Sequence, residues 1–255
     1  MAIDRFYQPN LQEPFLTGEE AHHCLHVLRH EVGDRIVLFD GRGNETMNEI
    51  LTVEKNRVTL KQLNLHHTPR PNYRLTLVQA IPKAKQMDNL LQKATELGVT
   101  DIIPIISERT IVQLEEQRAE NKREKWQQLI IEAAKQCGQN WLPTLHPLFT
   151  VRDYFETHFA SDLNFIGSLQ PGAMTFKTIF TRYHQDHQKK PNHVCILIGP
   201  EGDFTPAEIN LALSHGCQPV TLGSIVLKSE TAAIFSLSIL SYELQNELGC
   251  TNEIA

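Results

Sequence analysis

From residue 74 onward, short apolar runs alternate with amphipathic helices, and this alternation constrains the fold more than any other feature. Apolar residues spaced at i, i+3, i+4 predict helices over 86–98 and 122–138, each ending at a glycine. Strands alternating with helices imply a mostly parallel sheet, with ligand loops at the carboxyl ends of the strands. The predicted strands are 74–81, 99–106, 163–167, 194–199 and 218–223.

The first 65 residues follow a different pattern. Short strands separated by the turns GRGN and KN predict a small β-barrel between Arg35 and Leu65. Before it, a helix is predicted from residue 19, with Gly33 just past its end. The segment HHTPRPN, with two prolines and little apolar content, is the natural domain boundary. We therefore expect one domain over residues 1–72 and a second, α/β domain over 73–255.

Composition limits the class of protein. With 41% hydrophobic and 21% charged residues, the 255-residue chain is expected to be globular. Its five cysteines are far apart and form no C-x-x-C pair, which favours reduced, mostly buried thiols. No apolar run suits a signal peptide or a bilayer span, so we expect a cytoplasmic protein with no membrane partner.

The charge distribution bears on nucleic-acid binding. The formal net charge of -6 argues against general coating of nucleic acid, which usually needs a basic surface. Acidic residues are concentrated after residue 142, so any basic surface facing RNA should come from the earlier segments.

Three predicted strands end in glycine-containing loops, namely Gly167–Leu169, Gly199–Gly202 and Leu222–Leu227. In a parallel sheet these loops lie together, and glycine lets a ligand approach the backbone closely. No G-x-G-x-x-G follows a strand, which removes the usual pyrophosphate cradle and favours a cofactor without phosphates. Taken singly, each glycine is equally explained as a turn.

Two helix starts adjoin these loops. The sequence Thr205-Pro206-Ala207-Glu208 is a capping box with proline at the first helical position. The polar cluster Lys228–Thr231 precedes a strongly apolar helix and has two interpretations. Either Ser229 or Thr231 caps that helix while Glu230 favours its dipole, or the cluster lies beside the cofactor. The apolar helix face suits a homodimer, although an internal core explains it equally well.

Two other patterns carry less weight. His22 and His26 are spaced for zinc on a helix, but residue 23 is His rather than the Glu of H-E-x-x-H, so no metal is expected. Gly41-Arg42-Gly43 lies in a hairpin with no following helix, unlike a phosphate-binding loop.

Several motifs occur together between about Arg5 and Tyr242, above all KAKQMDNLLQKATELG, LIGPEG and LKSETA. In combination they resemble the RsmE family, bacterial small-subunit ribosomal RNA uridine-N3 methyltransferases of the SPOUT superfamily. The resemblance implies a PUA-like RNA-binding β-barrel followed by a trefoil-knotted, S-adenosylmethionine-dependent α/β methyltransferase domain. It also implies a homodimer in which the partner completes the RNA site, and 16S ribosomal RNA, in the assembled small subunit, as substrate.

The chemistry of this reaction nominates catalytic and RNA-binding residues, and the resemblance adds the residues of the cofactor pocket. Lys228 is expected to stabilise the uridine anion, and Glu201 or Glu230 to accept the N3 proton, with no choice between them. The expected RNA contacts are Arg5, Arg29, Arg42, Lys83, Lys85 and Arg109, although each is equally explained as a solvated charge. By position, S-adenosylmethionine would be held by Gly167, Leu197, Ile198, Gly199, Gly202, Leu222, Ser224, Ile225 and Leu227.

Three positions depart from the family's usual pattern. Lys228 stands where arginine is common and loses arginine's planar fork, Gln139 stands near a usually basic position, and Asp203 stands at a usual glycine. Two alternatives stay open: a related knotted methyltransferase acting on transfer RNA or another ribosomal position, and a non-catalytic RNA-binding assembly factor. A nucleotide-using α/β enzyme is disfavoured because phosphate motifs are missing.

Overall fold

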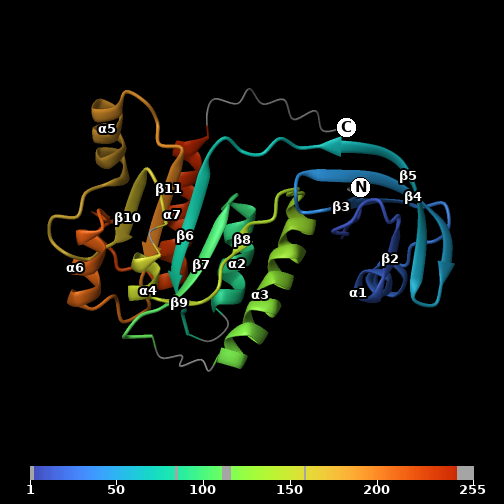
Figure 1. The fold of residues 1–255 in the computed structure, drawn as a ribbon, viewed down its shortest axis with the longest axis horizontal. Coiled ribbons are helices and arrows are strands. Elements are labelled where there is room, and N and C mark those ends of the chain that lie inside the picture. The colour runs from blue at the N-terminus through green and yellow to red at the C-terminus, as the bar shows by residue number, and fades with distance from the viewer. Residues whose placement is uncertain (1–2, 84–85, 111–115, 158, 246–255) are drawn as a thin grey trace. The chain divides into compact units, whose positions relative to one another are not determined.

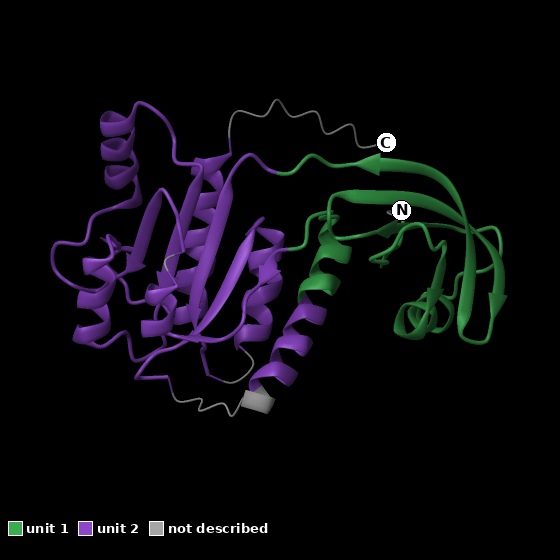
Figure 2. Cartoon of the chain, in the orientation of Figure 1, with its two compact units in different colours: residues 1–70, 130–142 green, residues 71–129, 143–255 purple. Residues whose placement is uncertain are grey.

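The computed structural model describes residues 3–83, 86–110, 116–157 and 159–245. The chain forms two compact units (Figures 1 and 2). Unit 1 contains residues 1–70 and 130–142, and unit 2 contains residues 71–129 and 143–255. Residues 130–142, which the sequence places in the predicted second domain, belong to unit 1 in the structure.

Unit 1 is built on a five-stranded sheet with the order β1-β3-β4-β5-β2. The strand β1 pairs with β3 in parallel, and the other pairs are antiparallel. Two register shifts interrupt the β4–β5 ladder, and such bulges bend a sheet. The predicted hairpins are confirmed, but β1 and β2 were missed because three residues carry little pattern. The strands are β1 Arg5–Tyr7, β2 Phe15–Thr17, β3 Arg35–Phe39, β4 Asn44–Glu54 and β5 Arg57–His67.

The helix of unit 1 is shorter than predicted. Helix α1, Gly18–His22, continues as a π-helical turn, η1, His23–Val27. The helix does not reach Gly33, because Arg29 takes a left-handed backbone conformation with φ of 62°. Ala21 and Cys24 pack on the core of the half-barrel, together with Phe6, Leu16, Ile36, Leu38, Ile50, Val58 and Leu60.

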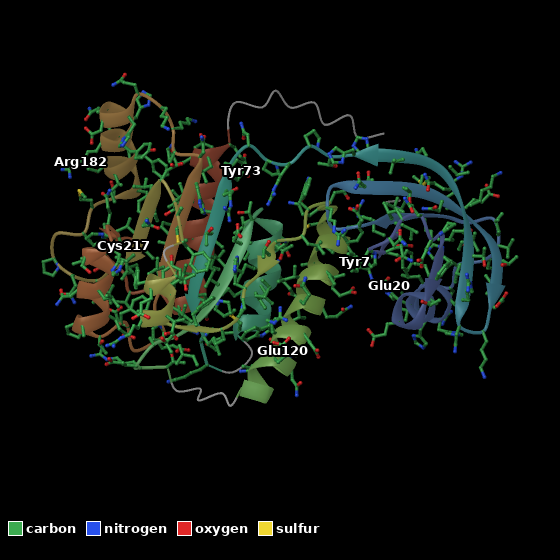
Figure 3. All side chains as sticks on the ribbon, viewed as in Figure 1. Tyr7, Glu20, Tyr73, Glu120, Arg182 and Cys217 are labelled. Carbon is green, nitrogen blue, oxygen red and sulfur yellow. The ribbon has the colours of Figure 1, made fainter. Side chains whose placement is uncertain are left out.

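The segment 130–142 is held in unit 1 by a buried lysine. The ammonium of Lys135 lies 3.1 Å from both carboxylate oxygens of Glu20, which Figure 3 labels, and 3.0 Å from Glu132. Only 7% of the Lys135 side chain is exposed. A buried ammonium requires such partners, so this ion pair ties the end of helix α3 to unit 1.

The sheet of unit 2 has seven strands in the order β12-β10-β11-β6-β7-β8, and β9 also pairs with β7 (Figure 1). All the ladders described in it are parallel, which confirms the prediction. The two-residue strands β8 and β9 were not predicted. The strands are β6 Arg74–Ala80, β7 Asp101–Ile106, β8 Thr144–Leu145, β9 Phe149–Thr150, β10 Leu163–Gly167, β11 His193–Ile198 and β12 Gln218–Val220.

Helices pack on both faces of this sheet. Helices α2 and α7 contact each other, and α7 contacts β6 and β11. Helices α4 and α6 lie over the other face, on a core that includes Val78, Ile166 and Leu197 (Figure 1). The helices are α2 Gln86–Glu96, α3 Glu116–Cys137, α4 Val151–Glu156, α5 Phe176–His187, α6 Pro206–Ser214 and α7 Ser229–Leu244.

The apolar spacing of the helix predicted over 122–138 implies a buried face, and in α3 Trp126, Ile130 and Ala133 are buried while Leu129 is partly buried. The expectation of mostly buried thiols is confirmed for Cys24, Cys195 and Cys217. Cys137 was expected to be buried and is exposed, because it lies in the last turn of α3. Among the helices that the structure describes, none has the length and apolar character needed to cross a membrane.

Candidate cofactor site

The three glycine loops meet at the carboxyl edge of the sheet in unit 2. They follow β10, β11 and β12, which are neighbours because β10 pairs with both of the others. Together with the first turn of α7, the loops enclose a cavity of about 300 Å³. This volume lies at the lower end of the roughly 300–1,000 Å³ range of small-molecule sites.

Six of the nine residues expected to hold the cofactor line this cavity, namely Gly167, Ile198, Gly199, Leu222, Ile225 and Leu227. The other three do not line it. Leu197 has its side chain in the hydrophobic core, and Gly202 and Ser224 are exposed nearby. Lining residues that the sequence analysis did not name for the cofactor belong to the same loops or to the start of α7: Ser168, Leu169, Pro200, Asp203, Gly223, Val226, Ser229 and Ala232.

The last of the three loops exposes apolar side chains beside the cavity. Gly223 has φ of +117°, a conformation that favours glycine, and the chain then runs through Ser224 to Ile225 and Val226. Ile225 is 76% exposed and Val226 is 71% exposed. Neighbouring exposed apolar residues are typical of a surface that a ligand or partner covers.

Ser229 connects three elements around the cavity. Its hydroxyl donates to the carbonyl of Gly199 (2.6 Å) and accepts from the side-chain amide of Gln79 in β6 (3.0 Å). Lys228 is the N-cap residue of α7, and no side chain caps this helix. The capping interpretation of Ser229 and Thr231 is therefore wrong, since the Ser229 hydroxyl holds the loop after β11 instead.

Asp203 preserves a glycine-like turn. Its φ is 60°, in the left-handed region that aspartate tolerates better than most residues. Its amide donates to the carbonyl of Pro200 (3.0 Å), and its carboxylate accepts from the amide of Phe204 (2.8 Å). Aspartate at a usual glycine position therefore keeps the backbone turn and adds a carboxylate to the cavity wall.

The predicted capping box at the start of α6 is confirmed. Glu208 accepts from the amide of Thr205 (2.8 Å), and Thr205 accepts from the amide of Glu208 (3.3 Å). Glu208 also accepts from the amide of Glu108 (2.9 Å), and the neighbouring Arg109 donates to the carbonyl of Gly202 (2.7 Å). The segment after β7 thus braces the loop after β11.

The three proposed catalytic residues differ in their surroundings. Lys228 and Glu201 line the cavity, whereas Glu230 does not. One oxygen of Glu201 accepts from the backbone amide of Lys83 (2.9 Å), and the Gln86 amide can donate to the same oxygen (3.0 Å). Glu230 is partly buried, and its Oε2 atom has no hydrogen-bond partner among the described residues.

The expected RNA contacts are distributed over both units. Arg29 and Arg42 are exposed in unit 1, and Lys83 is exposed in unit 2. The Arg5 guanidinium donates to Glu45 (2.6 Å) and Asn140, and its side chain is 14% exposed. Arg109 is exposed but donates to Gly202, as described above. Lys85 lies outside the described residues.

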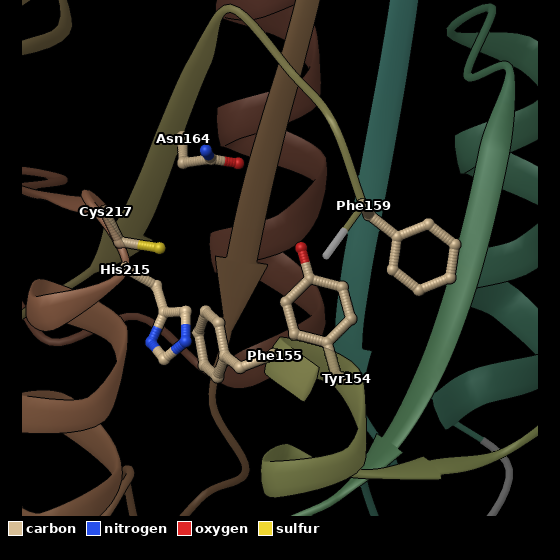
Figure 4. Close-up of a pocket in the computed structure, with 6 residues that line it drawn as sticks. All are labelled: Tyr154, Phe155, Phe159, Asn164, His215 and Cys217. Carbon is tan, nitrogen blue, oxygen red and sulfur yellow. The ribbon is translucent and has the colours of Figure 1, made fainter. Parts of the chain in front are cut away.

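A second cavity, of about 150 Å³, is lined by residues of α4, β10 and the segment before β12 (Figure 4), and none of its described residues lines the glycine-loop cavity. It is smaller than most ligand sites. Burial raises the pKa of the Cys217 thiol in its wall to about 12, so this thiol stays protonated near neutral pH. The lining residues are Tyr154, Phe155, Phe159, Asn164, His215 and Cys217.

No metal centre is found in the part of the chain that the structure describes, where groups of three or more ligating side chains do not occur. The rings of His22 and His26 lie side by side, with centroids 4.9 Å apart. Two imidazoles alone would leave a zinc ion without a structural ligand set.

Residues 68–241 match the RNA methyltransferase domain family, and residues 16–63 match the RNA methyltransferase PUA domain. With the fold described above, these matches define an RNA methyltransferase in which a PUA-like half-barrel precedes a parallel α/β methyltransferase domain.

Individual relatives narrow this class. The ribosomal RNA small subunit methyltransferase E from Neisseria gonorrhoeae, solved with S-adenosylmethionine bound, is 31% identical with a TM-score of 0.82, over 94% of this chain and 98% of that one. A Legionella pneumophila protein solved with the same cofactor is 34% identical with a TM-score of 0.85, over 95% and 98%. Ribosomal RNA small subunit methyltransferase E of Bacillus subtilis is 28% identical over 90% of both chains. The chain belongs to the RsmE family.

Proposed function

We propose that the protein uses S-adenosylmethionine to methylate N3 of a uridine in 16S ribosomal RNA, on the assembled small subunit in the cytoplasm. The observation that carries this proposal is the cavity formed by the three glycine loops, in a chain of the RsmE family. Relatives from Neisseria gonorrhoeae and Legionella pneumophila were solved with S-adenosylmethionine bound.

The cavity suits this cofactor chemically. Its walls combine glycine backbone and apolar side chains with the carboxylates of Glu201 and Asp203 and, among the described residues, a single cationic side chain, Lys228. S-adenosylmethionine has no phosphate and carries a sulfonium cation, which carboxylates attract, whereas they repel a phosphate. When bound, the cofactor supplies a methyl group on a positively charged sulfur. The Ser229–Gly199 hydrogen bond fixes the loop that would hold it.

Lys228 is the proposed electrostatic catalyst. It is exposed, it lines the cavity, and it forms no ion pair with the described residues, so its ammonium is available to substrate. A cation placed there stabilises the negative charge that develops on uridine when N3 loses its proton. Lysine provides this charge as a point rather than as arginine's planar fork.

Glu201 is the preferred proton acceptor because it lines the cavity. Its Oε1 is occupied by the amide of Lys83, which leaves Oε2 for the N3 proton. Glu230, with its unpartnered Oε2, is the alternative. Comparing Glu201→Gln with Glu230→Gln separates them, since loss of the general base removes the acid limb of the pH–rate profile.

The proposal assigns residues 1–72 to RNA binding and residues 73–255 to catalysis. Arg29, Arg42 and Lys83 are its preferred phosphate contacts because their side chains are exposed. The loop before α7 lines the same cavity as both other glycine loops, and the proposal includes the trefoil knot that the family resemblance implies.

The proposed active form is a homodimer. On α7, Phe235 is 42% exposed and Tyr242 is 78% exposed, and both line a shallow apolar hollow with Ile234 and Ile239. Burying such a continuous helix face in a symmetric contact would remove it from water.

The test combines calorimetry with methylation assays. We expect heat on titration with S-adenosylmethionine, and N3-methyluridine in purified small subunits analysed by nucleoside mass spectrometry. Leu227→Trp should block the cavity and abolish both signals, whereas Leu213→Trp, on the exposed side of α6, should change neither. No heat with the wild type would favour the non-catalytic assembly factor. Methylation of transfer RNA alone would favour the other enzyme.

A further inference from the structure

We infer that unit 1 contains a site at which a base of single-stranded RNA stacks on Trp141. The flanking residues are Arg42, His67 and Arg70, and we call these four residues the Trp141 surface. The inference deepens the proposed function and rests on it in taking RNA as the ligand. It adds a nucleobase subsite formed by residues that the sequence analysis did not bring together.

Three separate segments of the chain build this surface. The amide of Gly43 donates to the carbonyl of Asn140 (2.9 Å), and the amide of Leu142 donates to the carbonyl of Gly41 (3.0 Å). The amide of Thr68 donates to the carbonyl of Gly43 (2.7 Å). The hairpin turn, the segment after β5 and the segment after α3 therefore form one hydrogen-bonded backbone layer beneath Trp141.

The indole of Trp141 is fixed on this layer. Its N–H donates to the carbonyl of Thr68 (2.9 Å). A Cβ atom at Gly43, where φ is +95°, would lie 2.6 Å from two indole atoms, so only glycine lets the ring pack there. The side chain remains partly exposed. A preoriented, partly exposed ring whose polar atom is already satisfied is a suitable stacking platform.

Arg70 and the ring of His67 lie next to the indole, and Arg42 pairs with Trp141 through a backbone bridge. The Arg70 guanidinium lies 5.4 Å from the indole centroid, and the His67 ring stands edge-on at 6.2 Å. Arg42 and Arg70 are exposed and form no ion pair with the residues described.

Two carboxylates next to the Gly41–Gly43 turn are already engaged. Asp40 accepts from the amides of Arg42 (2.7 Å) and Asn44 (3.0 Å), and Glu45 pairs with Arg5 (2.6 Å). An aromatic ring beside two guanidiniums that have no ion-pair partner among the described residues suits the base and the phosphates of a single-stranded nucleotide.

If Trp141 had a purely structural role, its side chain would serve to hold residues 140–142 in place. The backbone hydrogen bonds already fasten that segment, and such a role does not require the two exposed arginines. The two roles predict different results. Substituting a structural residue lowers the free energy of unfolding, whereas substituting a stacking residue lowers the affinity for RNA.

Tryptophan fluorescence tests the stacking directly. The chain has two tryptophans, and Trp126 is 3% exposed, so Trp126→Phe leaves Trp141 as the only emitter. We expect single-stranded decauridylate to quench Trp141 over the concentrations at which labelled decauridylate gains anisotropy. Quenching absent at saturation, or no binding of decauridylate at millimolar concentration, overturns the inference.

Substitutions in the full-length wild-type background give a second readout. Trp141→Leu should weaken decauridylate binding by about fivefold or more, and Trp141→Phe by less. Arg42→Ala and Arg70→Ala should each lower the salt slope of binding by about 1 with unchanged Tm. Arg57→Ala is the matched control, because Arg57 also lies over an aromatic ring, Phe15, but at the opposite end of the β4–β5 hairpin. It should leave the slope unchanged.

If Trp141→Leu fails to fold, the two arginine variants decide, and unchanged affinity in both overturns the inference. S-adenosylmethionine binding and methylation of small subunits are measured on Trp126→Phe as well as on the wild type. If those signals are lost while quenching persists, the proposed function fails and the stacking site stands. If quenching is lost while methylation persists, only the stacking site fails.

Discussion

The two edges of the parallel sheet in unit 2 use polar side chains in opposite ways. At the carboxyl edge, glycine loops enclose a cavity in which the ammonium of Lys228 has no ion-pair partner among the described residues. At the amino edge, Asp101 is 5% exposed and accepts hydrogen bonds from three side chains. These donors are Arg74 (3.0 Å), Thr100 (2.9 Å) and His146 (3.1 Å).

The amino edge therefore resembles a closed network rather than a ligand site. His193 and Thr76 are also paired there (2.8 Å), and the adjoining cavity is only about 110 Å³. Burial lowers the pKa of His193, with Arg74 adding to the effect, so the ring is kept neutral. Paired polar groups stabilise the amino edge, whereas the chemistry proposed at the carboxyl edge uses Lys228, which has no ion-pair partner among the described residues.

The largest expected effect is on stability, at the amino edge. Asp101→Ala removes the shared acceptor of three donors and should lower the free energy of unfolding by about 3–5 kcal/mol. Urea denaturation measures this change, and the exposed Asp186→Ala is the control. Affinity for S-adenosylmethionine in the folded protein should not change. If Asp101→Ala also lost affinity for S-adenosylmethionine, the two edges would not have separate roles.

The next effect is on catalysis, at the carboxyl edge. Lys228→Ala should lower kcat about 100-fold by removing the cation near the developing charge. Its free energy of unfolding should stay within about 0.5 kcal/mol of the wild type, because Lys228 is exposed. Lys228→Arg should retain activity, and Lys177→Ala, on α5, controls for general charge loss. A stability loss in Lys228→Ala without a kcat change would contradict the proposed role.

Acid unfolding should depend on the amino edge. Burial alone would raise the pKa of Asp101, but hydrogen bonds from His146, Thr100 and Arg74 outweigh it and lower the pKa to about 2. A carboxyl whose folded pKa is lowered stabilises the fold above its unfolded pKa, near 3.9, and loses this contribution as pH falls toward 2. The loss should be about 2 kcal/mol. Asp101→Asn should flatten the stability profile between pH 4 and 2, and an unchanged slope would contradict this assignment.

The smallest effect concerns the left-handed turn at Asp203. Asp203→Gly should change the free energy of unfolding by less than about 1 kcal/mol, because glycine adopts φ of 60° without strain. Asp203→Ala should be less stable than Asp203→Gly by about 1 kcal/mol. Thermal unfolding compares the two variants, and equal stabilities would show that backbone strain is absent at this position.

The carboxyl-edge site was predictable because its signals are local. Each signal occupies a few consecutive residues: the glycines at strand ends, the Thr205–Glu208 capping box and the polar cluster before α7. In a parallel sheet, loops that follow neighbouring strands lie at the same edge, so these segments are expected to lie together. The hydrogen bonds within the site could not be predicted in the same way. Helix-cap preferences suggest that Ser229 caps α7, whereas its hydroxyl donates to the carbonyl of Gly199.

The other features of the structure could not be predicted, because they bring together residues far apart in the sequence. Arg5 looks like a free cation until it is seen paired with Glu45 and Asn140. The Asp101 network joins residues from β6, β7 and the segment after β8, and no periodicity relates them. The Trp141 surface likewise needs a glycine 98 positions earlier in the chain, at Gly43, to accommodate its ring.

The assignment of residues 130–142 to unit 1 has a consequence for dissecting this protein. The chain crosses between the units at residues 70–71, 129–130 and 142–143. A fragment ending at residue 72 would contain every strand of the half-barrel. It would lack Lys135, the ion-pair partner of Glu20, and Asn140, which donates a hydrogen bond to Thr68. A fragment that contains all of unit 1 must therefore join two separate stretches of the sequence, because truncation at residue 72 removes residues 130–142.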